Sequence, residues 1–523
     1  MKTKPNLNFW KLWNISFGFF GVQIAYALQS ANISRIFTTL GSDPHDLSYF
    51  WILPPLMGIL VQPIVGVASD KTWTRFGRRI PYLFVGSLVA IIVMLLLPNA
   101  GSFNMSVSTA MIFGLIALMF LDTSINMAMQ PFKMLVGDMV NEKQKGLAYS
   151  IQSFLCNAGS VVGFLFPILF TWIGISNIAP DGVIPDTVIY SFYIGALILI
   201  GCVIYTTLKV KEMPPKEYNE YHNIDTSKKE DKIALFSLLK KAPKVFWTVG
   251  VVQFFCWGAF MYMWTYTPGS IAKGAFDAPV IEKIQSIEYT DNGKVITLTG
   301  NHFSADAQNL TDEKGTYLAA SDAILKNATV LQVDQQKIEL TDAQRQTLQL
   351  HKQKRLDSTS KEYQEAGNWV GVLFAVQAIG SVIWAIFIPL FKNKKFIYAL
   401  SLLLGGIGFI SVGYVHDPHL LFASYALIGC AWAAMLALPF TLLTNALSGA
   451  HMGAYLGLFN GTICVPQIVA SLLGGSILGF LTPTNGIAPE IDMLSLAGIF
   501  LFVGAACVYL IKEEYGERQT LKS

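Results

Sequence analysis

The composition of this 523-residue chain is typical of a membrane protein. Hydrophobic residues make up 53% of it, charged residues make up 14%, and the net charge is +3. Because a soluble domain carries about 25% charged residues, an ordinary soluble protein is excluded. Nucleic-acid binding is excluded too, since the basic residues are scattered between apolar segments and form no continuous basic block.

Twelve apolar segments are long enough to cross the hydrocarbon core of a bilayer, which takes about 20 helical residues. The first segment is too long and too polar for a cleaved signal peptide. We therefore expect an all-α membrane protein with spans at 11–34, 48–69, 80–98, 108–137, 147–174, 187–208, 245–268, 367–391, 395–414, 419–446, 453–480 and 492–511. An even number of spans places both termini on the same side of the membrane.

Basic residues in the short loops indicate the orientation of the spans. They occur in the amino-terminal tail and in the loops after the second and fourth spans, as Lys2, Lys4, Lys11, Lys71, Arg75, Arg78, Arg79, Lys143 and Lys145. The alternate short loops contain no lysine or arginine; these are 99–107, 175–186, 415–418 and 481–491. By the positive-inside rule, we expect an integral protein of the cell membrane, inner or plasma, with both termini in the cytoplasm.

Two longer hydrophilic segments divide the chain. Residues 209–244 read as a cytoplasmic linker between two halves of six spans, an arrangement typical of a transporter built from two bundles. The expected amino-terminal bundle is 1–208, and the expected carboxyl-terminal bundle comprises 245–268 and 367–523. The remaining segment, 269–366, falls between spans seven and eight on the extracytoplasmic side.

The extracytoplasmic segment reads as a small soluble insertion. Ile287 to Thr290 and Lys294 to Thr299 flank an Asp-Asn-Gly turn, which is typical of a β-hairpin. The charged stretch from Ala343 to Glu365 is predicted to form a helix. The sequence gives no function for this insertion.

A single acid, Asp122, lies in the middle of the fourth span. An ionised carboxylate in hydrocarbon costs several kcal/mol, so such a residue usually faces a cavity and moves a proton or an ion. No other carboxylate lies in the middle of a predicted span, which favours protons, because a sodium site needs several oxygen ligands. A role in helix packing is the alternative.

Two further polar residues share the helix face of Asp122. They are Asn126 and Lys133, and Lys133 lies about 16 Å along the helix from Asp122 at about 1.5 Å per residue. A solute with several hydroxyl groups could fill part of that gap, with Asn126 as a hydroxyl ligand. Alternatively, Lys133 extends to the inner membrane surface.

The loop after the second span holds glycines, an acid and a basic cluster, and a further acid ends the fourth span. These residues are Gly66, Asp70, Arg75, Gly77, Arg78, Arg79 and Asp138. They resemble the loop motif of the major facilitator superfamily, in which the acid and the arginines clamp the two halves on the inner face. Four residues separate Asp70 from Arg75, whereas in the commonest form the cluster directly follows the acid. A generic basic loop would explain the arginines but not the acid and the glycines.

Short segments in both halves support a narrower resemblance. They are Gly21 to Gln29, Val61 to Gly66, Leu121-Asp122, Gln130-Pro131 and Val465 to Gln467. These segments are similar to those of the plant sucrose/proton symporters and their animal and bacterial relatives, the glycoside and disaccharide cation symporters. The resemblance implies the major facilitator fold, with twelve helices in two six-helix bundles, and proton-coupled uptake of an α-glucoside disaccharide such as sucrose or maltose. It also implies a proton acceptor at Asp122 and a sugar or charge-balancing partner at Lys133, where the plant proteins carry arginine.

Other polar and aromatic residues in the spans are candidate sugar ligands. Gln23 and Tyr26 share one face of the first span, and Asn460 and Gln467 share one face of the eleventh. Such faces serve either a solute or helix packing. Aromatic residues of the seventh span, Trp257 and Trp264 among them, could stack on sugar rings or belong to an interfacial belt.

The sequence has no P-loop motif for ATP, and we expect a carrier and not an enzyme. We expect no catalytic residue, cofactor or metal ion, and partners limited to a sugar, a proton and the lipid bilayer, with the chain a monomer. Three alternative functions remain at this stage: a proton-driven exporter of amphipathic compounds, a sodium-coupled glycoside symporter and a sugar sensor that does not transport.

Overall fold

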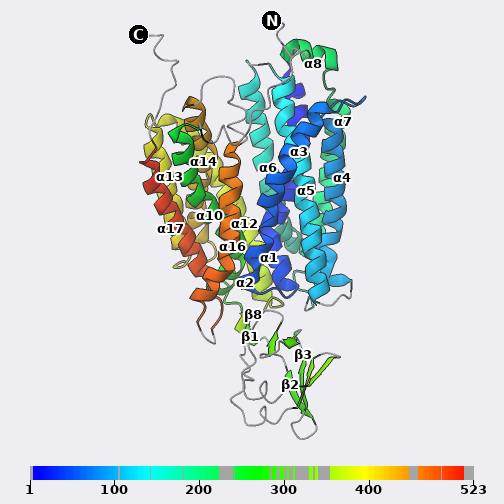
Figure 1. The fold of residues 1–523 in the computed structure, drawn as a ribbon, viewed down its shortest axis with the longest axis vertical. Helices are drawn as coiled ribbons and strands as arrows, with labels where there is room; N and C mark the ends of the chain where they lie inside the picture. The colour runs from blue at the N-terminus through cyan, green and yellow to red at the C-terminus, as the bar shows by residue number, and fades with distance from the viewer. Residues whose placement is uncertain are drawn as a thin grey trace. The chain divides into compact units, whose positions relative to one another are not determined.

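The computed structural model describes most of the chain. The described ranges are 4–103, 107–141, 143–180, 182–222, 240, 242–282, 286–290, 295–299, 303–305, 310–312, 329–333, 336–339, 354–446, 458–483 and 486–511. Long helices dominate them (Figure 1). Contacts between Cα atoms group the helices into one compact unit, and a β module, made of Ala278–Asp357 with Leu478–Pro489, forms a second.

The first half of the chain forms a helical bundle, which we call the amino-terminal bundle. Its helices are α1 (Phe9–Thr39), α2 (Pro44–Phe50), α3 (Leu53–Lys71), α4 (Ile80–Leu96) with the short 3-10 helix η1 (Leu97–Ser102), α5 (Val107–Met139), α6 (Lys145–Trp172) and α7 (Asp186–Lys209). Within the bundle, α1 packs against α5, α6 and α7, while α4 packs against α5 and α7. This packing places the fourth predicted span, now α5, beside the first, α1.

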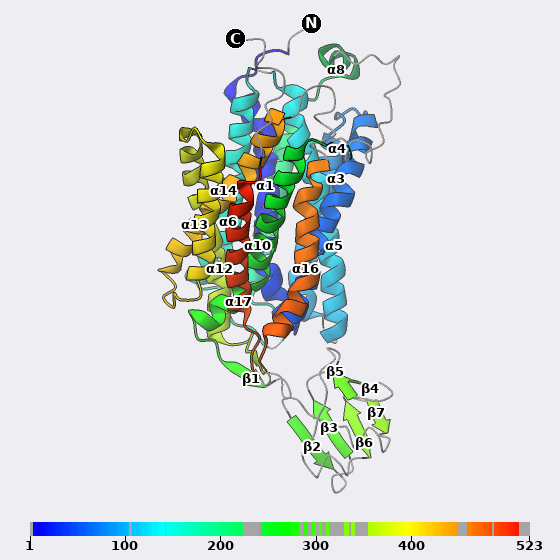
Figure 2. The same ribbon diagram turned by 60° about the vertical axis from the view of Figure 1, so that its left-hand side comes forward.

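The second half forms the carboxyl-terminal bundle. Its helices are α10 (Lys244–Gly274), α12 (Lys361–Phe387) with the 3-10 helix η3 (Ile388–Leu390), α13 (Lys394–Ser411), α14 (Leu421–Ala446), α16 (Gly461–Leu481) and α17 (Glu490–Val508). Here α10 packs against α17, and α14 packs against α12 and α13 (Figure 2). A short helix, α8 (Pro215–His222), follows the first bundle.

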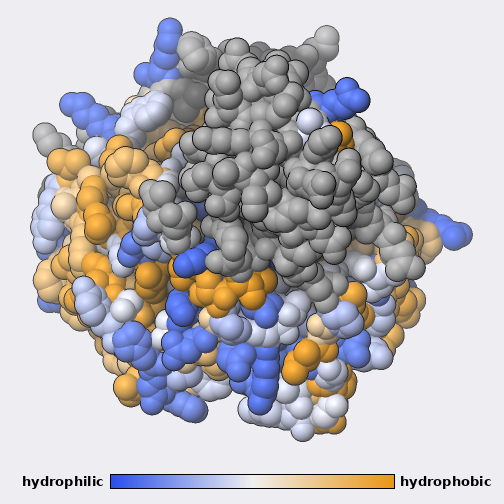
Figure 3. Space-filling model, turned by 90° about the horizontal axis from the view of Figure 1, so that it is seen from below, coloured by the Kyte–Doolittle hydropathy of each residue, from blue (hydrophilic) through white to orange (hydrophobic). Residues whose placement is uncertain are grey.

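The long helices among the described residues lie where the spans were predicted. Eleven of them are long and apolar enough to cross a membrane, judged by length and composition. The remaining predicted span corresponds to α1, whose 31 residues suffice for a crossing but include many polar side chains. Apolar side chains also reach the surface of the helices, where Trp172, Leu208 and Ile386 are exposed; Figure 3 shows the molecule from below, coloured by hydropathy.

Capping residues explain where several helices begin. Asp43 caps α2 and accepts a hydrogen bond from the backbone N–H of His45, with Pro44 in the first turn. Ser360 caps α12 in the same way through Tyr363, and Asn393 caps α13 through Lys395 and Phe396. These side chains satisfy backbone N–H groups that have no partner inside the helix.

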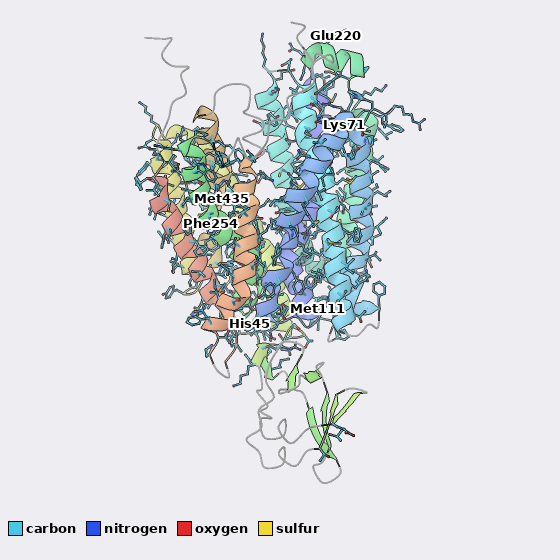
Figure 4. All side chains as sticks on the ribbon, in the orientation of Figure 1. His45, Lys71, Met111, Glu220, Phe254 and Met435 are labelled. Atoms are coloured by element: carbon cyan, nitrogen blue, oxygen red, sulfur yellow. The ribbon has the colours of Figure 1, made fainter. Side chains whose placement is uncertain are left out.

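We call the two ends of the helical unit the arginine end and the α2 end. The arginine end holds the loop between Lys71 and Ile80, and the α2 end holds residues 41–52. Figure 4 shows Lys71 and Glu220 at the first end and His45 and Met111 at the second, with Phe254 and Met435 between them.

The β module has three small sheets. Strands β1 (Val280–Glu282) and β8 (Lys354–Leu356) pair antiparallel. A four-stranded sheet has the order β2-β3-β6-β7 (Ser286–Thr290, Val295–Thr299, Val330–Val333 and Gln336–Glu339), with β3 and β6 parallel. Strands β4 (Phe303–Ala305) and β5 (Leu310–Asp312) form the third.

The structure confirms one prediction for the insertion and corrects another. The predicted hairpin is present, since β2 pairs antiparallel with β3 and Thr290 faces Val295. The helix predicted from Ala343 to Glu365 is wrong from Lys354 to Ser360, because Lys354–Leu356 is a strand and helix α12 begins only at Lys361; its last residues, Lys361 to Glu365, are helical as predicted. Cross-strand pairing with β1 decides the conformation of this short charged segment; residues 341–353 lie outside the described ranges.

Candidate functional site

Asp122 lies deep inside the amino-terminal bundle, with 2% of its surface exposed. Its carboxylate Oδ1 accepts a hydrogen bond from Nε2 of Gln29 on α1, at 2.5 Å. Within the described residues no lysine, arginine or histidine nitrogen lies within 4.0 Å of this carboxylate, and its Oδ2 has no hydrogen-bond partner. The buried acid is therefore paired with a neutral amide.

The amide of Gln29 is only half satisfied. Its Nε2 donates to Asp122, but its Oε1 is buried and has no partner among the described side chains. Two oxygens of this pair, Oε1 of Gln29 and Oδ2 of Asp122, thus lack a donor. Buried polar atoms without partners are costly and call for an explanation such as a missing proton.

One turn along α5 from Asp122 lies a second polar layer. Asn126 Nδ2 donates to the backbone oxygen of Asp122 at 2.9 Å, and Asn126 Oδ1 accepts from Gln62 of α3 at 2.7 Å. A Cβ atom built on Gly58 would lie 3.8 Å from Asn126 and 3.7 Å from Cys464 of α16. The layer therefore reaches the carboxyl-terminal bundle.

The structure brings only some of the predicted sugar ligands near Asp122. Tyr26 lies one turn from Gln29 on α1 and is partly exposed, whereas Gln23 is buried and its Oε1 accepts from Ser160 of α6 at 3.4 Å. Gln23 thus also contributes to helix packing.

The remaining three predicted ligands are Asn460, Gln467 and Lys133. Asn460 directly precedes α16, and its Nδ2 contacts Cys464 Sγ at 3.9 Å. Gln467 lies two turns further along and is mostly buried. Lys133 lies in α5, but its side chain is outside the described part of the structure.

Aromatic side chains gather in the carboxyl-terminal bundle. The ring of Trp432 on α14 lies 5.7 Å from that of Trp257 and 5.9 Å from that of Trp264, both on α10. Trp257 and Trp264 are each 7% exposed, so they do not form an interfacial belt. The indole nitrogen of Trp257 has no partner among the described residues, which leaves one donor for a ligand.

The predicted loop motif forms a dense ionic cluster at the arginine end. Asp138 accepts from Arg78 at 2.7 Å and from Arg79 at 3.0 Å, while Asp70 accepts from Arg79 at 2.5 Å. Arg79 also donates to the backbone oxygen of Gly66 and to Ser69. Arg75 takes no part in this pairing; its guanidinium lies 4.7 Å above the ring of Phe76.

Glu212, which sequence reasoning missed, completes this cluster. Its carboxylate accepts from the backbone N–H groups of Arg78, Arg79 and Ile80 at 3.1, 2.8 and 2.8 Å, and so caps the start of α4 from outside the helix. Gly77, at φ +113°, leaves room for the Glu212 side chain, because a Cβ at this position would lie 2.5 Å from Glu212. Burial raises the pKa of the Glu212 carboxyl, and the three N–H donors act in the opposite direction.

Arg35 on α1 is the second residue that the sequence did not reveal. It is 1% exposed and bridges the two bundles through Gln364 and Asn368 of α12. A charged residue near the end of a predicted span usually reads as an interfacial residue. Only the fold shows that this one points at another helix.

Other contacts between the bundles lie at the α2 end or near it. Ser48 Oγ accepts from the backbone N–H of Gly475 at 2.9 Å, and the rings of Trp51 and Trp264 stack at 6.1 Å. Helices α6 and α12 pack so closely that a Cβ on Gly371 would lie 2.2 Å from the backbone oxygen of Phe164. The two bundles are closed against each other at this end.

Among the described residues, the ion pairs of the loop motif all lie within the first half of the chain, so they join helices of one bundle and do not clamp the two halves together. Two bundles of membrane-length helices, with a buried acid and an ionic cluster in the first, define the class of this protein as a membrane transporter. The chain belongs to the Major Facilitator Superfamily, whose family model matches residues 15–277 and 357–523. This membership confirms the predicted fold and the resemblance to the superfamily.

Several relatives are sugar transporters by name. The general alpha-glucoside permease of Schizosaccharomyces pombe is 27% identical over 275 residues, which cover 47% of this chain and 46% of the permease. The sucrose transport protein SUC3 of Arabidopsis thaliana is 27% identical over 28% of this chain and 27% of its own length. The mouse proton-associated sugar transporter A is 24% identical over 31% and 22%. The chain thus spans less than half the length of these relatives.

Solved structures share the fold along nearly the whole chain. The nucleoside transporter NupG has a TM-score of 0.60 at 12% identity and covers 96% of this chain and 98% of its own. A D-xylose-proton symporter has a TM-score of 0.57 at 13% identity, covering 96% of each chain. At these identities the likeness concerns the fold alone.

Proposed function

We propose that this protein is a proton-coupled symporter that brings a neutral sugar into the cell. The sugar class that we propose is an α-glucoside disaccharide such as sucrose or maltose. Three of the relatives described above carry sucrose, alpha-glucoside or a proton-associated sugar in their names. In this proposal the chain acts as a monomer in the cell membrane, with the arginine end in the cytoplasm.

The observation that carries the proposal is the pairing of Asp122 with a neutral amide. An arginine or lysine partner would hold the carboxylate in its charged form. Gln29 offers an N–H donor to the carboxylate and a carbonyl acceptor to the carboxylic acid, so it suits both protonation states. Oδ2 of Asp122 and Oε1 of Gln29 both lack a partner among the described residues. A single proton on Oδ2 would supply a donor that the two oxygens can share.

Coupling follows from alternating access to this acid. When the α2 end is open, a proton binds to the carboxylate of Asp122. The neutral acid then remains buried with the sugar bound while access changes from one side to the other, because a neutral carboxyl costs far less to bury than an ionised one. When the arginine end opens, water reaches Asp122 and the proton leaves to the cytoplasm. The carrier then returns empty.

The proposed sugar site lies between the bundles near the level of Asp122. From the first bundle, the sugar would bind to the amide groups of Asn126 and Gln62. It would also contact Tyr26, Gln23 and Lys133. Asn460 and Gln467 of the α16 region would serve it from the second. Trp257, with its unpartnered indole nitrogen, supplies an apolar face for a pyranose ring.

The ionic cluster of the loop motif would control the cytoplasmic side. Arg78 and Arg79 tie the end of α3, at Asp70, to the end of α5, at Asp138. Helix α5 carries both Asp138 of this cluster and Asp122. A rearrangement of the cluster that moves α5 would therefore also move the proton site.

The test is uptake of radiolabelled sucrose or maltose by proteoliposomes that contain the purified protein. An imposed inward proton gradient should drive accumulation by the native chain, while Asp122→Asn should abolish accumulation and leave sugar counterflow measurable. Asp186→Asn, an exposed acid at the start of α7, is the matched control and should behave like the native chain.

The same assay separates the alternatives. Accumulation that follows a sodium gradient at fixed pH would replace the proton by sodium. Sugar binding without counterflow would indicate a sensor, and extrusion of an amphipathic compound without sugar flux would indicate an exporter. Unaltered gradient-driven accumulation by Asp122→Asn would remove Asp122 from the mechanism.

A further inference from the structure

The guanidinium of Arg35 joins the two bundles through four hydrogen bonds. Its Nε donates to Oε1 of Gln364 and its Nη1 to Oδ1 of Asn368, each at 2.8 Å. Its Nη2 donates to the backbone oxygen of Gln364 at 3.1 Å and to Oδ1 of Asn177 at 2.9 Å. Asn177 belongs to the amino-terminal bundle, while Gln364 and Asn368 belong to the other. One buried cation therefore holds both bundles.

The acceptor amides are held in the orientation that Arg35 needs. Nδ2 of Asn368 donates to Oγ1 of Thr171 at 2.7 Å, and Nε2 of Gln364 donates to the backbone oxygen of Ser358 at 2.5 Å. Each of these amides must then turn its oxygen toward the guanidinium. The contact is thus a built site and not an incidental approach of a long side chain.

A glycine makes room for the guanidinium against α12. A Cβ on Gly367 would lie 2.5 Å from Nε and 2.6 Å from Cδ of Arg35. Real Cβ atoms do not approach other atoms so closely, so alanine at this position conflicts with the bridge. Gly367 lies between the two acceptors Gln364 and Asn368 on the same helix.

The described partners of Arg35 are all neutral. In the described part of the chain no carboxylate lies within 4.0 Å of its guanidinium. Separation of the bundles takes away the acceptors on α12, and water must replace them, because an unsatisfied buried cation is very costly. Neutral acceptors allow this exchange more readily than a carboxylate would, since a carboxylate would also attract the guanidinium by its opposite charge.

We propose that Arg35, with Gln364 and Asn368, is the gate that closes the transport pathway at the α2 end and that must open before solute enters there. The gate breaks and reforms in each cycle, and the absence of an acid among its partners in the described residues keeps it reversible. This inference depends on alternating access of the two bundles, but not on the identity of the solute or of the coupling ion.

The test measures the separation of the bundles directly. Phe103 and Tyr414 are exposed at the α2 end, one on each bundle, and accept bio-orthogonal spin labels that spare the six native cysteines. Distances between the labels in lipid nanodiscs report the ratio of open to closed molecules. Arg35→Gln should raise this ratio by about tenfold, a change that corresponds to about 1.4 kcal/mol.

Two further variants make the test specific. Asn368→Asp turns a neutral acceptor into an ionic one and should shift the population toward the closed form, but only while Arg35 is present. Gly367→Ala should favour the open form in the native chain and add nothing to Arg35→Gln. Variants that fail to elute as a single species are replaced by Arg35→Lys, which keeps the charge but loses the forked geometry and should open the gate partially.

The outcomes decide the proposal irrespective of solute. An unchanged distance distribution in Arg35→Gln overturns it, as does an effect of Asn368→Asp that persists without Arg35. Sugar and proton play no part in this measurement, so a failed transport assay would leave the gate assignment standing.

Discussion

Gln29 and Asp122 meet at 2.5 Å between α1 and α5, in a region where neither side chain has another hydrogen-bonding partner among the described residues. An amide carries both a donor and an acceptor, so it can serve a carboxylate and a carboxylic acid. If Asp122 carries the coupling proton, Gln29 determines how readily both protonation states exist inside the bundle.

Replacing Gln29 tests this relationship. Gln29→Leu removes a hydrogen bond to a charged group, which is worth about 1.5–3 kcal/mol, so gradient-driven sugar accumulation should fall by roughly ten- to a hundredfold. Counterflow, which needs no net proton movement, should fall much less. Gln29→Asn keeps the amide on a shorter side chain and should retain more activity than leucine. Equal loss of accumulation and counterflow would indicate a packing defect.

Glu212 gives a prediction about stability. Glu212→Ala leaves three backbone N–H groups at the start of α4 without an acceptor, and each unsatisfied buried group costs about 1–3 kcal/mol. Glu212→Gln retains one acceptor oxygen and should lose less. Thermal unfolding of the purified protein in detergent measures both, with Glu217→Ala on the adjacent helix α8 as a control. An unchanged unfolding temperature in Glu212→Ala would show that water replaces the carboxylate.

The raised pKa of Glu212 gives this contribution a pH dependence. Because its pKa is higher in the folded chain than in the unfolded chain, the folded chain binds this proton more tightly. The stability contributed by the protonated group is therefore present at low pH and declines as the pH rises through the raised pKa of the folded chain, above about 4.5. The unfolding temperature of the native chain, measured relative to Glu212→Gln, should be higher at the acidic end. A difference that grows with pH would reverse the sign and show that the N–H donors outweigh burial.

Gly77 lies in the loop motif, and Gly174, which lies outside it, is a matched control for a substitution at Gly77. Both have positive φ, at +113° and +92°, but a Cβ on Gly77 would meet Glu212, whereas Gly174 has no atom within 4 Å. Gly174→Ala should cost only the backbone strain, about 1–2 kcal/mol. Gly77→Ala should cost this amount and also displace the Glu212 cap. Thermal unfolding of the two variants, alone and with Glu212→Ala, checks whether the excess disappears when the cap is absent.

The sequence predicted the features that depend on local pattern. The spans follow from apolar length, the loop motif from residue types in one segment, and Asp122 from its charge inside an apolar run. Even the β2 and β3 hairpin followed from the turn residues between two short strands.

The features that were missed depend on pairs of residues far apart in the chain. Gln29 is 93 residues from Asp122, Glu212 is 134 residues from Arg78, and Arg35 is 329 residues from Gln364. A helical period shows which residues share a face, but it does not show which helix that face meets. For this reason Gln23 and Tyr26 were selected from α1 as candidate ligands, and Gln29, on the same helix, was not.

The close approach of α6 and α12 gives a final prediction, independent of Arg35. A Cβ on Gly371 would lie 2.2 Å from the backbone oxygen of Phe164, and backbone cannot move aside as a flexible side chain can. Gly371→Ala should therefore hold the bundles apart at the α2 end and reduce sugar uptake, whereas Gly201→Ala on α7, where no atom lies within 4 Å, should transport normally. Initial uptake rates in proteoliposomes, with the distance between labels at Phe103 and Tyr414, measure both effects. Normal uptake with an unchanged distance in Gly371→Ala would mean that the two helices need not approach so closely during transport.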